Sequence, residues 1–210
     1  LRASDALKQA FEVVRPDICI TIADSLDYAS RVYRKVYSQG YLDVSARVPE
    51  LYKFIFRTTD SMEMLKKHAK MRKFSIKVNL SRLVKFVKEF NPDAAVCTHF
   101  TPVEVLCGMK RDGCFNAPIA CTVTDFVAHA MCLDKDIDAY FTANKETAEY
   151  METLGFDATR ILDAGIPILP VFAKSMDRRD AEMKLGLKPG SRTALVLGGV
   201  VRVADDVQRP

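Results

Sequence analysis

The sequence predicts an α/β domain in which a mostly parallel sheet carries helices on both faces. Short apolar runs alternate with segments of helical periodicity along the chain, as they do in α/β proteins. Each run is hydrophobic almost throughout, which is expected of strands that helices cover on both sides. The five expected strands are residues 17–23, 94–98, 118–124, 139–143 and 160–164.

Helices are expected between these strands. The segments 102–111 and 145–154 have helical periodicity, and Gly155 follows the second as a helix-terminating glycine. The opening residues, up to Val14, have the same periodicity, so we expect a strand and a turn to precede Leu1.

Three parts are expected along the chain. Residues 1–170 form the α/β domain, residues 171–190 form a linker, and residues 191–210 begin a second domain. The linker is expected to hold one amphipathic helix over residues 178–185, and the breaker pair Pro189-Gly190 closes it.

The interval from about residue 26 to residue 90 contains no expected strand and is rich in aromatic and basic side chains. Tyr33, Tyr37 and Tyr41 recur every four residues, as they would on one face of a helix. The interval is therefore predicted to be a helical insertion. Its basic residues, interleaved with apolar ones, include Lys66, Lys67, Lys70, Arg72, Lys73 and Lys77.

Two interpretations of this insertion are open. A basic amphipathic region of this kind can lie on an anionic membrane surface. In the other interpretation, the aromatic side chains form a helix-packing core and the lysines form a solvated face. The membrane interpretation predicts lipid contact through Tyr33, Tyr37, Tyr41, Tyr52, Phe54 and Phe56, assisted by the lysines.

Composition narrows the class of protein. With 210 residues, of which 49% are hydrophobic, the chain can bury a substantial core. A formal net charge of +4 gives no global reason to expect a nucleic-acid partner. The six cysteines lack framework spacing and lie mostly among apolar residues, which predicts reduced core thiols in a cytoplasmic protein. No apolar run approaches the roughly 20 residues of a spanning helix, and no signal-peptide pattern opens the chain.

Polar residues that follow the strands are the candidates for chemistry, because ligands of open α/β sheets bind beyond the carboxyl ends of the strands. Thr98 ends one expected strand and His99 follows it. Thr124 ends the next strand and Asp125 follows it, with His129 four residues after the aspartate. We therefore expect these residues to lie near one another at one edge of the sheet.

A carboxylate beside a neutral imidazole supports general-base catalysis, which makes Asp125, His129 and His99 the catalytic candidates. The alternative is that Asp125 caps a helix and that the imidazoles only hydrogen-bond to the backbone. No metal ion is expected, because the histidines and cysteines lack a known ligand spacing. The turn at Gly165 and Pro167 follows a later strand and is expected to lie at the cleft or at a domain hinge.

Ordered motifs along the chain resemble one enzyme family. The first group is Asp24-Ser25-Leu26-Asp27-Tyr28, Tyr37-Ser38-Gln39-Gly40-Tyr41 and Val48-Pro49-Glu50-Leu51-Tyr52. The second group is Cys97-Thr98-His99-Phe100, Val123-Thr124-Asp125-Phe126 with His129, Ile137-Asp138-Ala139-Tyr140-Phe141 and Ala164-Gly165-Ile166-Pro167-Ile168. In this order, over about residues 1–199, they resemble the monogalactosyldiacylglycerol synthase and processive diacylglycerol glycosyltransferase family.

The resemblance implies a GT-B architecture, in which two Rossmann-like domains face each other across a cleft. The chain would be the N-terminal half, which binds the diacylglycerol acceptor, followed by the start of the half that binds the UDP-sugar donor. The implied reaction transfers galactose or glucose to diacylglycerol at the cytoplasmic membrane surface, with the UDP-sugar as co-substrate and without a cofactor or metal ion. The implied acceptor-binding residues are Thr98, Thr124, Phe126, Tyr37, Tyr41 and Tyr52, and Gly198 and Gly199 would belong to an incomplete donor-phosphate site.

The chain departs from the family pattern in three places. The family's Gly-His loop would fall before Leu1, and Cys132 stands where the family usually has Trp. After Gly199, the segment 200–202 replaces an expected third glycine and helix, so we expect the chain by itself to be inactive. Two other functions stay open: a non-catalytic membrane-binding module and a GT-B enzyme with a non-lipid acceptor.

Overall fold

The computed structural model describes residues 2–37, 48, 50–51, 54 and 59–194. The chain forms two compact units, Leu1–Pro170 and Val171–Pro210. The larger unit holds the sheet and every candidate residue that the structure describes. The finer division into a first domain, a linker and the start of a second domain stays a prediction.

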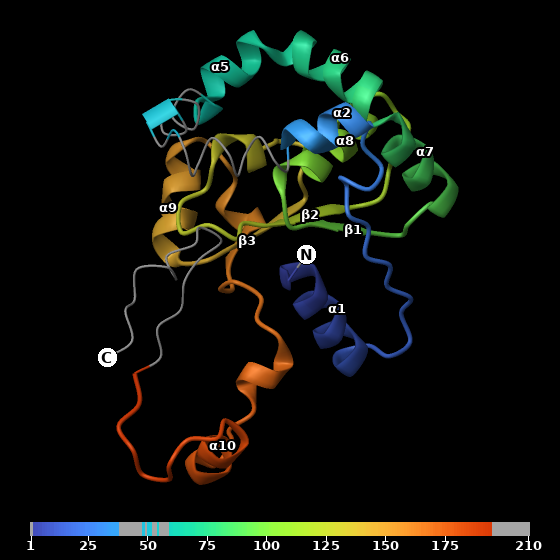
Figure 1. Ribbon diagram of the computed structural model, residues 1–210. Coiled ribbons are helices and arrows are strands. Elements are labelled where there is room, and N and C mark those ends of the chain that lie inside the picture. Colours follow the sequence, from blue (N-terminus) through green and yellow to red (C-terminus); the bar gives the residue numbers. More distant parts are fainter. Residues whose placement is uncertain (1, 38–47, 49, 52–53, 55–58, 195–210) are drawn as a thin grey trace. The chain divides into compact units, whose positions relative to one another are not determined.

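A four-stranded parallel sheet forms the centre of the larger unit (Figure 1). Its strands are β1 (Ala95–Cys97), β2 (Ile119–Thr122), β3 (Ala139–Thr142) and β4 (Ile161–Asp163), which lie side by side in chain order. Each strand pairs in parallel with the next. The α/β fold class and four of the five expected strands are confirmed.

The helices between the strands lie close to their predicted ranges. α8 (Phe100–Arg111) follows β1 and begins two residues earlier than predicted, because the side chain of His99 caps its first turn. α9 (Lys145–Thr153) follows β3 and is terminated by Gly155, whose φ of 83° suits glycine. The connection between β2 and β3 contains one turn of 3₁₀ helix, η2 (Ala130–Cys132).

The main core lies between one face of the sheet and α8. Cys97, Cys121 and Tyr140 point to this face from neighbouring strands and are almost fully buried. Cys107 of α8 belongs to the same cluster and is completely buried. All six cysteines are free thiols, and Cys19 and Cys114 are exposed instead of lying in the core.

The opposite face of the sheet is less completely covered. α1 (Arg2–Val14) lies on this side (Figure 1), where the hydroxyl of Ser4 is 2.9 Å from the hydroxyl of Thr98. Val96 and Leu162 point to the same face and remain 45% and 48% exposed. Helices thus lie on both sides of the sheet, but only the α8 side is fully packed.

The prediction of a strand over residues 17–23 is wrong. This segment is irregular, and Ile18 within it is 39% exposed. A strand needs a neighbouring backbone with which to pair its N–H and C=O groups. Among the described residues, β1 pairs with β2 alone, and residues 17–23 do not pair with its other edge, so their backbone groups are not part of a ladder.

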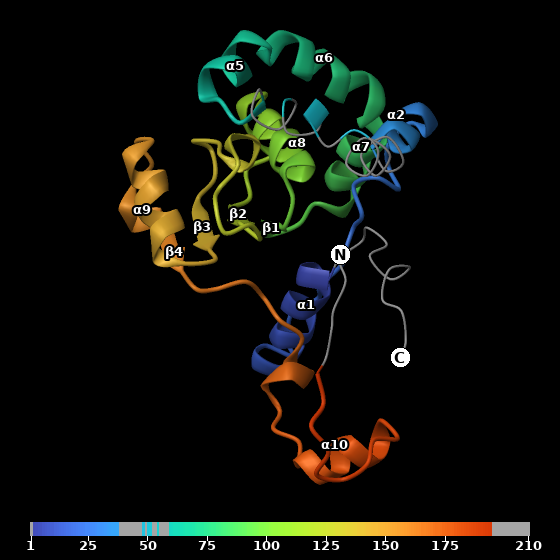
Figure 2. The ribbon, with the colours of Figure 1, turned by 60° about the vertical axis from the view of Figure 1, so that its left-hand side comes forward.

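The insertion is helical wherever the structure describes regular structure in it. Two of its helices, α5 and α6, arch over α8 in both Figure 1 and Figure 2. The hydroxyl of Ser30 accepts the first-turn N–H of Tyr33 and donates to the side chain of Asn79 at 2.6 Å, which ties the start of α2 to the end of α6. The insertion helices are α2 (Arg31–Lys35), α5 (Met62–Lys67), α6 (Ala69–Asn79) and α7 (Ser81–Phe90).

The smaller unit contains α10 (Arg178–Lys184), which confirms the helix expected there. Glu182 is buried and accepts hydrogen bonds from Arg178 and from the backbone N–H of Gly190, so it fixes the turn after the helix. Gly198 and Gly199, the expected donor-phosphate residues, lie outside the described residues. The remaining short elements are η3 (Ala158–Arg160) and η4 (Pro170–Ala173).

Candidate functional site

His99 lies at the carboxyl end of β1 and forms the N-cap of α8. Its Nδ1 accepts a hydrogen bond from the backbone N–H of Thr101 at 3.3 Å, and its ring is 4.1 Å from the ring of Phe100. Protein around the ring removes water and lowers the pKa of His99, while the carboxylates of Asp125 and Asp24 oppose this shift. The neutral ring that accepts at Nδ1 carries its hydrogen on Nε2.

His129 has the same role one strand further along the chain. Its Nδ1 accepts the backbone N–H of Met131 at 3.2 Å, so the imidazole caps η2. Its Nε2 is 3.5 Å from the hydroxyl of Thr59. Next to it, the carboxylate of Asp60 accepts the backbone N–H of Ala130 at 2.8 Å, which anchors the segment before α5 to the turn that carries His129.

Asp125 follows β2 and is exposed to solvent. It does not cap η2, because His129 does so, and it makes no hydrogen bond or ion pair with any described residue. Its charge acts on both His99 and Cys132, so its carboxylate lies near these two side chains. The imidazoles therefore do bond to the backbone, as the alternative interpretation held, whereas Asp125 is left available for chemistry.

A cavity of about 410 Å³ lies beneath the arch of α5 and α6. Its lining is mostly apolar, and Met64, Met71 and Ile76 of the arch contribute to it. A volume of this size falls within the roughly 300–1,000 Å³ that is typical of small-molecule sites. The other lining residues are Tyr33, Tyr37, Thr59, His68, Arg72, Ser75, Glu104 and Met131.

Two aromatic side chains form one wall of this cavity. The rings of Tyr33 and Tyr37 stack with their centroids 5.0 Å apart, and Tyr37 also packs on Phe100 at 5.8 Å. Burial raises the pKa of both tyrosines, so both phenols are neutral at physiological pH. These two tyrosines line the cavity and are half-buried, as the interpretation of a helix-packing core expects, and their contact with a membrane stays a prediction.

An ion pair forms part of another wall. Nε of Arg72 lies 2.6 Å from a carboxylate oxygen of Glu104, and the two side chains are only 25% and 18% exposed. The contact is not aligned as a hydrogen bond, so charge attraction is what stabilises it. Sequence analysis did not predict this pair, because Arg72 reads as one more cation in a basic run.

The cavity adjoins the candidate catalytic residues. Thr59 and Met131 line it and also contact His129, while Phe100 joins Tyr37 of the wall to His99. The structure thus brings four predicted residues, His99, Asp125, His129 and Tyr37, to one end of the sheet. The cavity residues from α5 and α6 are the part of the site that sequence reasoning missed.

The other predicted residues have different surroundings. Thr98 bonds to Ser4 and Thr124 is half-buried, both at the same end of the sheet. Phe126 is 71% exposed, and its backbone oxygen accepts a hydrogen bond from Thr147. Tyr41 and Tyr52 lie outside the described residues.

The turn at Gly165 and Pro167 lies beyond β4, so β3 separates it from Asp125. Gly165 has a φ of 80°, and its N–H donates to the backbone oxygen of Thr142 at 3.0 Å. This geometry explains the glycine. The expected role of the turn as a hinge or cleft residue stays a prediction.

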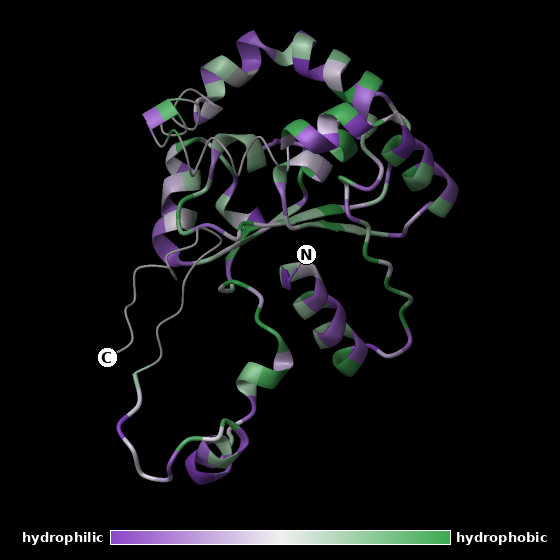
Figure 3. Ribbon diagram, viewed as in Figure 1, coloured by the Kyte–Doolittle hydropathy of each residue, from purple (hydrophilic) through white to green (hydrophobic). Residues whose placement is uncertain are grey.

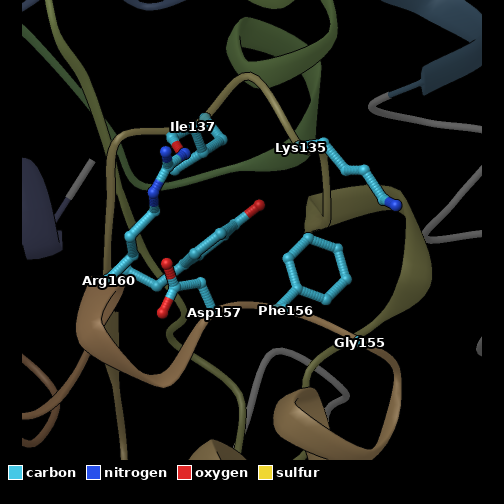
Figure 4. Close-up of a pocket in the computed structure, with 7 residues that line it drawn as sticks. Lys135, Ile137, Gly155, Phe156, Asp157 and Arg160 are labelled. Carbon is cyan, nitrogen blue, oxygen red and sulfur yellow. The ribbon is translucent and has the colours of Figure 1, made fainter.

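A second cavity, of about 170 Å³, lies near the amino end of β3 (Figure 4). Figure 4 shows the ring of Phe156 facing it and the guanidinium of Arg160 beside Ile137. The hydroxyl of Tyr140, which also lines it, is already bonded to the backbone N–H and C=O of Asp134. This cavity lies at the opposite strand ends from the candidate site and is too small for a typical substrate.

No group of three or more metal-ligating side chains occurs among the described residues. No helix within the described ranges is long and apolar enough to cross a membrane.

Comparison with known proteins identifies the family. The sequence matches the profile of monogalactosyldiacylglycerol (MGDG) synthase over residues 1–168, and the chain belongs to this family. It is 25% identical over 191 residues to the processive diacylglycerol beta-glucosyltransferase of Bacillus subtilis (strain 168), covering 90% of this chain and 48% of that protein.

Related enzymes give the same result. The processive diacylglycerol beta-glucosyltransferase of Bacillus cytotoxicus is 25% identical over 182 residues, which is 87% of this chain and 43% of that protein. The Staphylococcus epidermidis enzyme of the same name is 28% identical over 125 residues, which is 60% of this chain and 32% of its own length. The chain spans about half the length of the Bacillus relatives.

Proposed function

We propose that this member of the MGDG synthase family forms the acceptor-binding half of a glycosyltransferase that moves a hexose from a UDP-sugar to diacylglycerol. The observation that carries the proposal is the apolar cavity beneath α5 and α6, which adjoins His99 and His129 and lies at the same sheet end as Asp125. Diacylglycerol has apolar chains and one free hydroxyl, so it suits an apolar cavity whose rim carries polar groups.

The polar residues beside the cavity, His99, His129 and Asp125, have different roles in the proposed reaction. Glycosyl transfer to a hydroxyl needs a base close to that hydroxyl, and a correctly placed base is worth about 10²- to 10⁴-fold in rate. His99 and His129 each use Nδ1 as the acceptor of a backbone N–H, so a neutral ring presents only an Nε2–H donor. Asp125 is the exposed carboxylate beside them. Among the described residues, we assign Asp125 as the base and His99 as a hydrogen-bond donor.

The donor side of the reaction rests on the family resemblance. The UDP-sugar would act as co-substrate, with no cofactor or metal ion, and Gly198 and Gly199 would contribute to its phosphate site. The hexose is left unspecified, because the family profile is named for a galactolipid and the relatives for glucosyl transfer. The enzyme would work at the cytoplasmic surface of a membrane, without a nucleic-acid partner.

The test uses the product of the whole open reading frame that encodes this chain. Transfer of radiolabelled hexose from UDP-glucose or UDP-galactose to dioctanoylglycerol is expected, and Asp125→Asn is expected to reduce the rate about 100-fold or more. Asp163→Asn is the matched control, because Asp163 is also an exposed aspartate at the carboxyl end of a strand. Undiminished transfer in Asp125→Asn, with the fold intact, would remove Asp125 from the mechanism.

The same assay separates the alternatives. A non-catalytic membrane-binding module would bind vesicles without transferring hexose to any acceptor. A GT-B enzyme with a soluble acceptor would hydrolyse or transfer the donor sugar without dependence on diacylglycerol.

A further inference from the structure

One wall of the cavity beneath α6 carries a charged pair. Of the described residues that line the cavity, only Arg72 and Glu104 are acidic or strongly basic. Nε of Arg72, on α6, lies 2.6 Å from a carboxylate oxygen of Glu104, on α8. Figure 3 shows hydrophilic and hydrophobic residues alternating along the arch of α5 and α6. A charged side chain of this arch thus lines a cavity that is otherwise mostly apolar.

The guanidinium of Arg72 has unused hydrogen-bond donors. Its Nε is buried without an aligned acceptor, and the group donates no hydrogen bond to any residue that the structure describes. A guanidinium carries five N–H donors, and a buried donor without an acceptor costs free energy. Native structures contain few such groups, and each one calls for an explanation. An acceptor atom of a ligand in the cavity would satisfy this one.

Glu104 limits which acceptor fits. An arginine alone in an apolar cavity would attract carboxylates and phosphates, because the planar guanidinium matches their geometry. Glu104 places a negative charge 2.6 Å from Nε, so the pair is neutral as a whole and the carboxylate repels a second anion. Tyr33 and Tyr37 of the neighbouring wall are neutral phenols and do not offset this repulsion. The pair therefore favours an uncharged acceptor, such as an ester carbonyl.

The position of the pair suits an ester of the lipid. His99 caps α8, and Glu104 lies five residues further on, which is about 7.5 Å along the helix axis. Resting on the proposed function, the free hydroxyl of diacylglycerol lies beside His99 and Asp125. Its two esters are on the other carbons of the same glycerol, so their carbonyl oxygens extend from the hydroxyl over a distance of this order.

We propose that Arg72 and Glu104 make the cavity selective for an uncharged lipid with ester carbonyls. Arg72 donates to a carbonyl oxygen of the lipid, and Glu104 balances the positive charge that would otherwise admit fatty-acid carboxylates. The pair determines specificity and takes no part in proton transfer.

The first test compares two lipids that differ only in their carbonyl groups, dioctanoylglycerol and its diether analogue dioctylglycerol. Each displaces a fluorescent diacylglycerol from the product of the whole open reading frame, with no donor sugar present. The diester should bind about tenfold or more tightly, because the diether offers no carbonyl to the charged donor. Arg72→Met with Glu104→Gln removes both charges and should bind the two lipids about equally.

The second test uses a negative charge. Decanoate and methyl decanoate have the same chain, but only decanoate is an anion. Glu104→Gln leaves Arg72 without its counter-charge, so decanoate should bind about tenfold or more tightly than to the unaltered protein, and methyl decanoate should not gain. Partial unfolding cannot produce such a gain, and neither can a pair that only joins α6 to α8. Glu89→Gln is the matched control, because it removes an exposed carboxylate from an ion pair of α7 and should change neither preference.

The outcomes are distinct. Equal binding of the diester and the diether by the unaltered protein, or no gain for decanoate in Glu104→Gln, would overturn the role of the pair even if hexose is transferred. Ester-selective binding without hexose transfer to dioctanoylglycerol would uphold this role and contradict the proposed function instead.

Discussion

The ion pair in the cavity wall makes the sharpest prediction about stability. Glu104→Gln keeps the shape of the side chain but leaves the guanidinium of Arg72 without its carboxylate. Breaking a buried pair by removing one partner costs about 3–5 kcal/mol, and an exposed pair is worth about 0–1 kcal/mol. Because the two side chains are 25% and 18% exposed, we expect a loss of about 2 kcal/mol.

Thermal unfolding followed by circular dichroism measures this loss. A domain of 150–250 residues shifts by about 2–4 °C per kcal/mol, so the melting temperature should fall by about 4–8 °C. Glu89→Gln is the control, since its pair with Lys85 spans 3.6 Å between side chains that are 67% and 75% exposed. Adding Arg72→Met to Glu104→Gln should recover much of the loss, because it removes the unpaired charge. Equal effects of Glu104→Gln and Glu89→Gln would refute the assignment of a stabilising pair.

Three further predictions concern the strand ends and the core. The pKa of His99 is lowered in the folded state, so the unfolded chain binds more protons and the free energy of unfolding should fall as the pH drops below about 6.5. His99→Asn keeps a side chain that can cap α8 but removes the titrating group, so it should lessen this fall. Urea titrations at several pH values measure the difference. Burial raises the pKa of the Cys121 thiol well above its usual range, so iodoacetamide should label exposed Cys19 in the native protein and Cys121 only after unfolding, as mass spectrometry would show. Tyr140→Phe removes a hydroxyl that accepts the N–H of Asp134 at 2.7 Å and donates to its C=O at 2.8 Å. The free energy of unfolding in urea should fall by about 1–3 kcal/mol. A fall near zero would mean that water replaces the hydroxyl.

The sequence predicts those parts of the fold that depend on neighbouring residues, such as apolar runs and helix ends. Four of the predicted runs, which are mostly apolar, form strands, and each pairs with a neighbour in the sheet. Residues 17–23 show the same pattern but do not form a strand, because a strand also needs a partner backbone, which the apolar run itself does not specify. Gly155 correctly marked the end of a helix, since the left-handed turn after a helix is a local requirement.

The candidate site was predictable only in part. Parallel strands place their carboxyl ends at one edge, so the juxtaposition of His99, Asp125 and His129 follows from topology. Periodicity put Tyr33 and Tyr37 on one helix face but could not say whether that face points to solvent or to the core. The pair between Arg72 and Glu104 joins positions far apart in sequence, and no local pattern reports such a contact.

The placement of α6 follows from its period and from what lies beneath it. A helix at 3.6 residues per turn that sends Arg72 and Ile76 toward α8 must send Phe74 and Val78 away from it. Phe74 and Val78 are 69% and 56% exposed, with lysines beside them, while Glu104 holds the one arginine of the helix inward. The same helix therefore shapes the cavity with one face and leaves apolar side chains on the other.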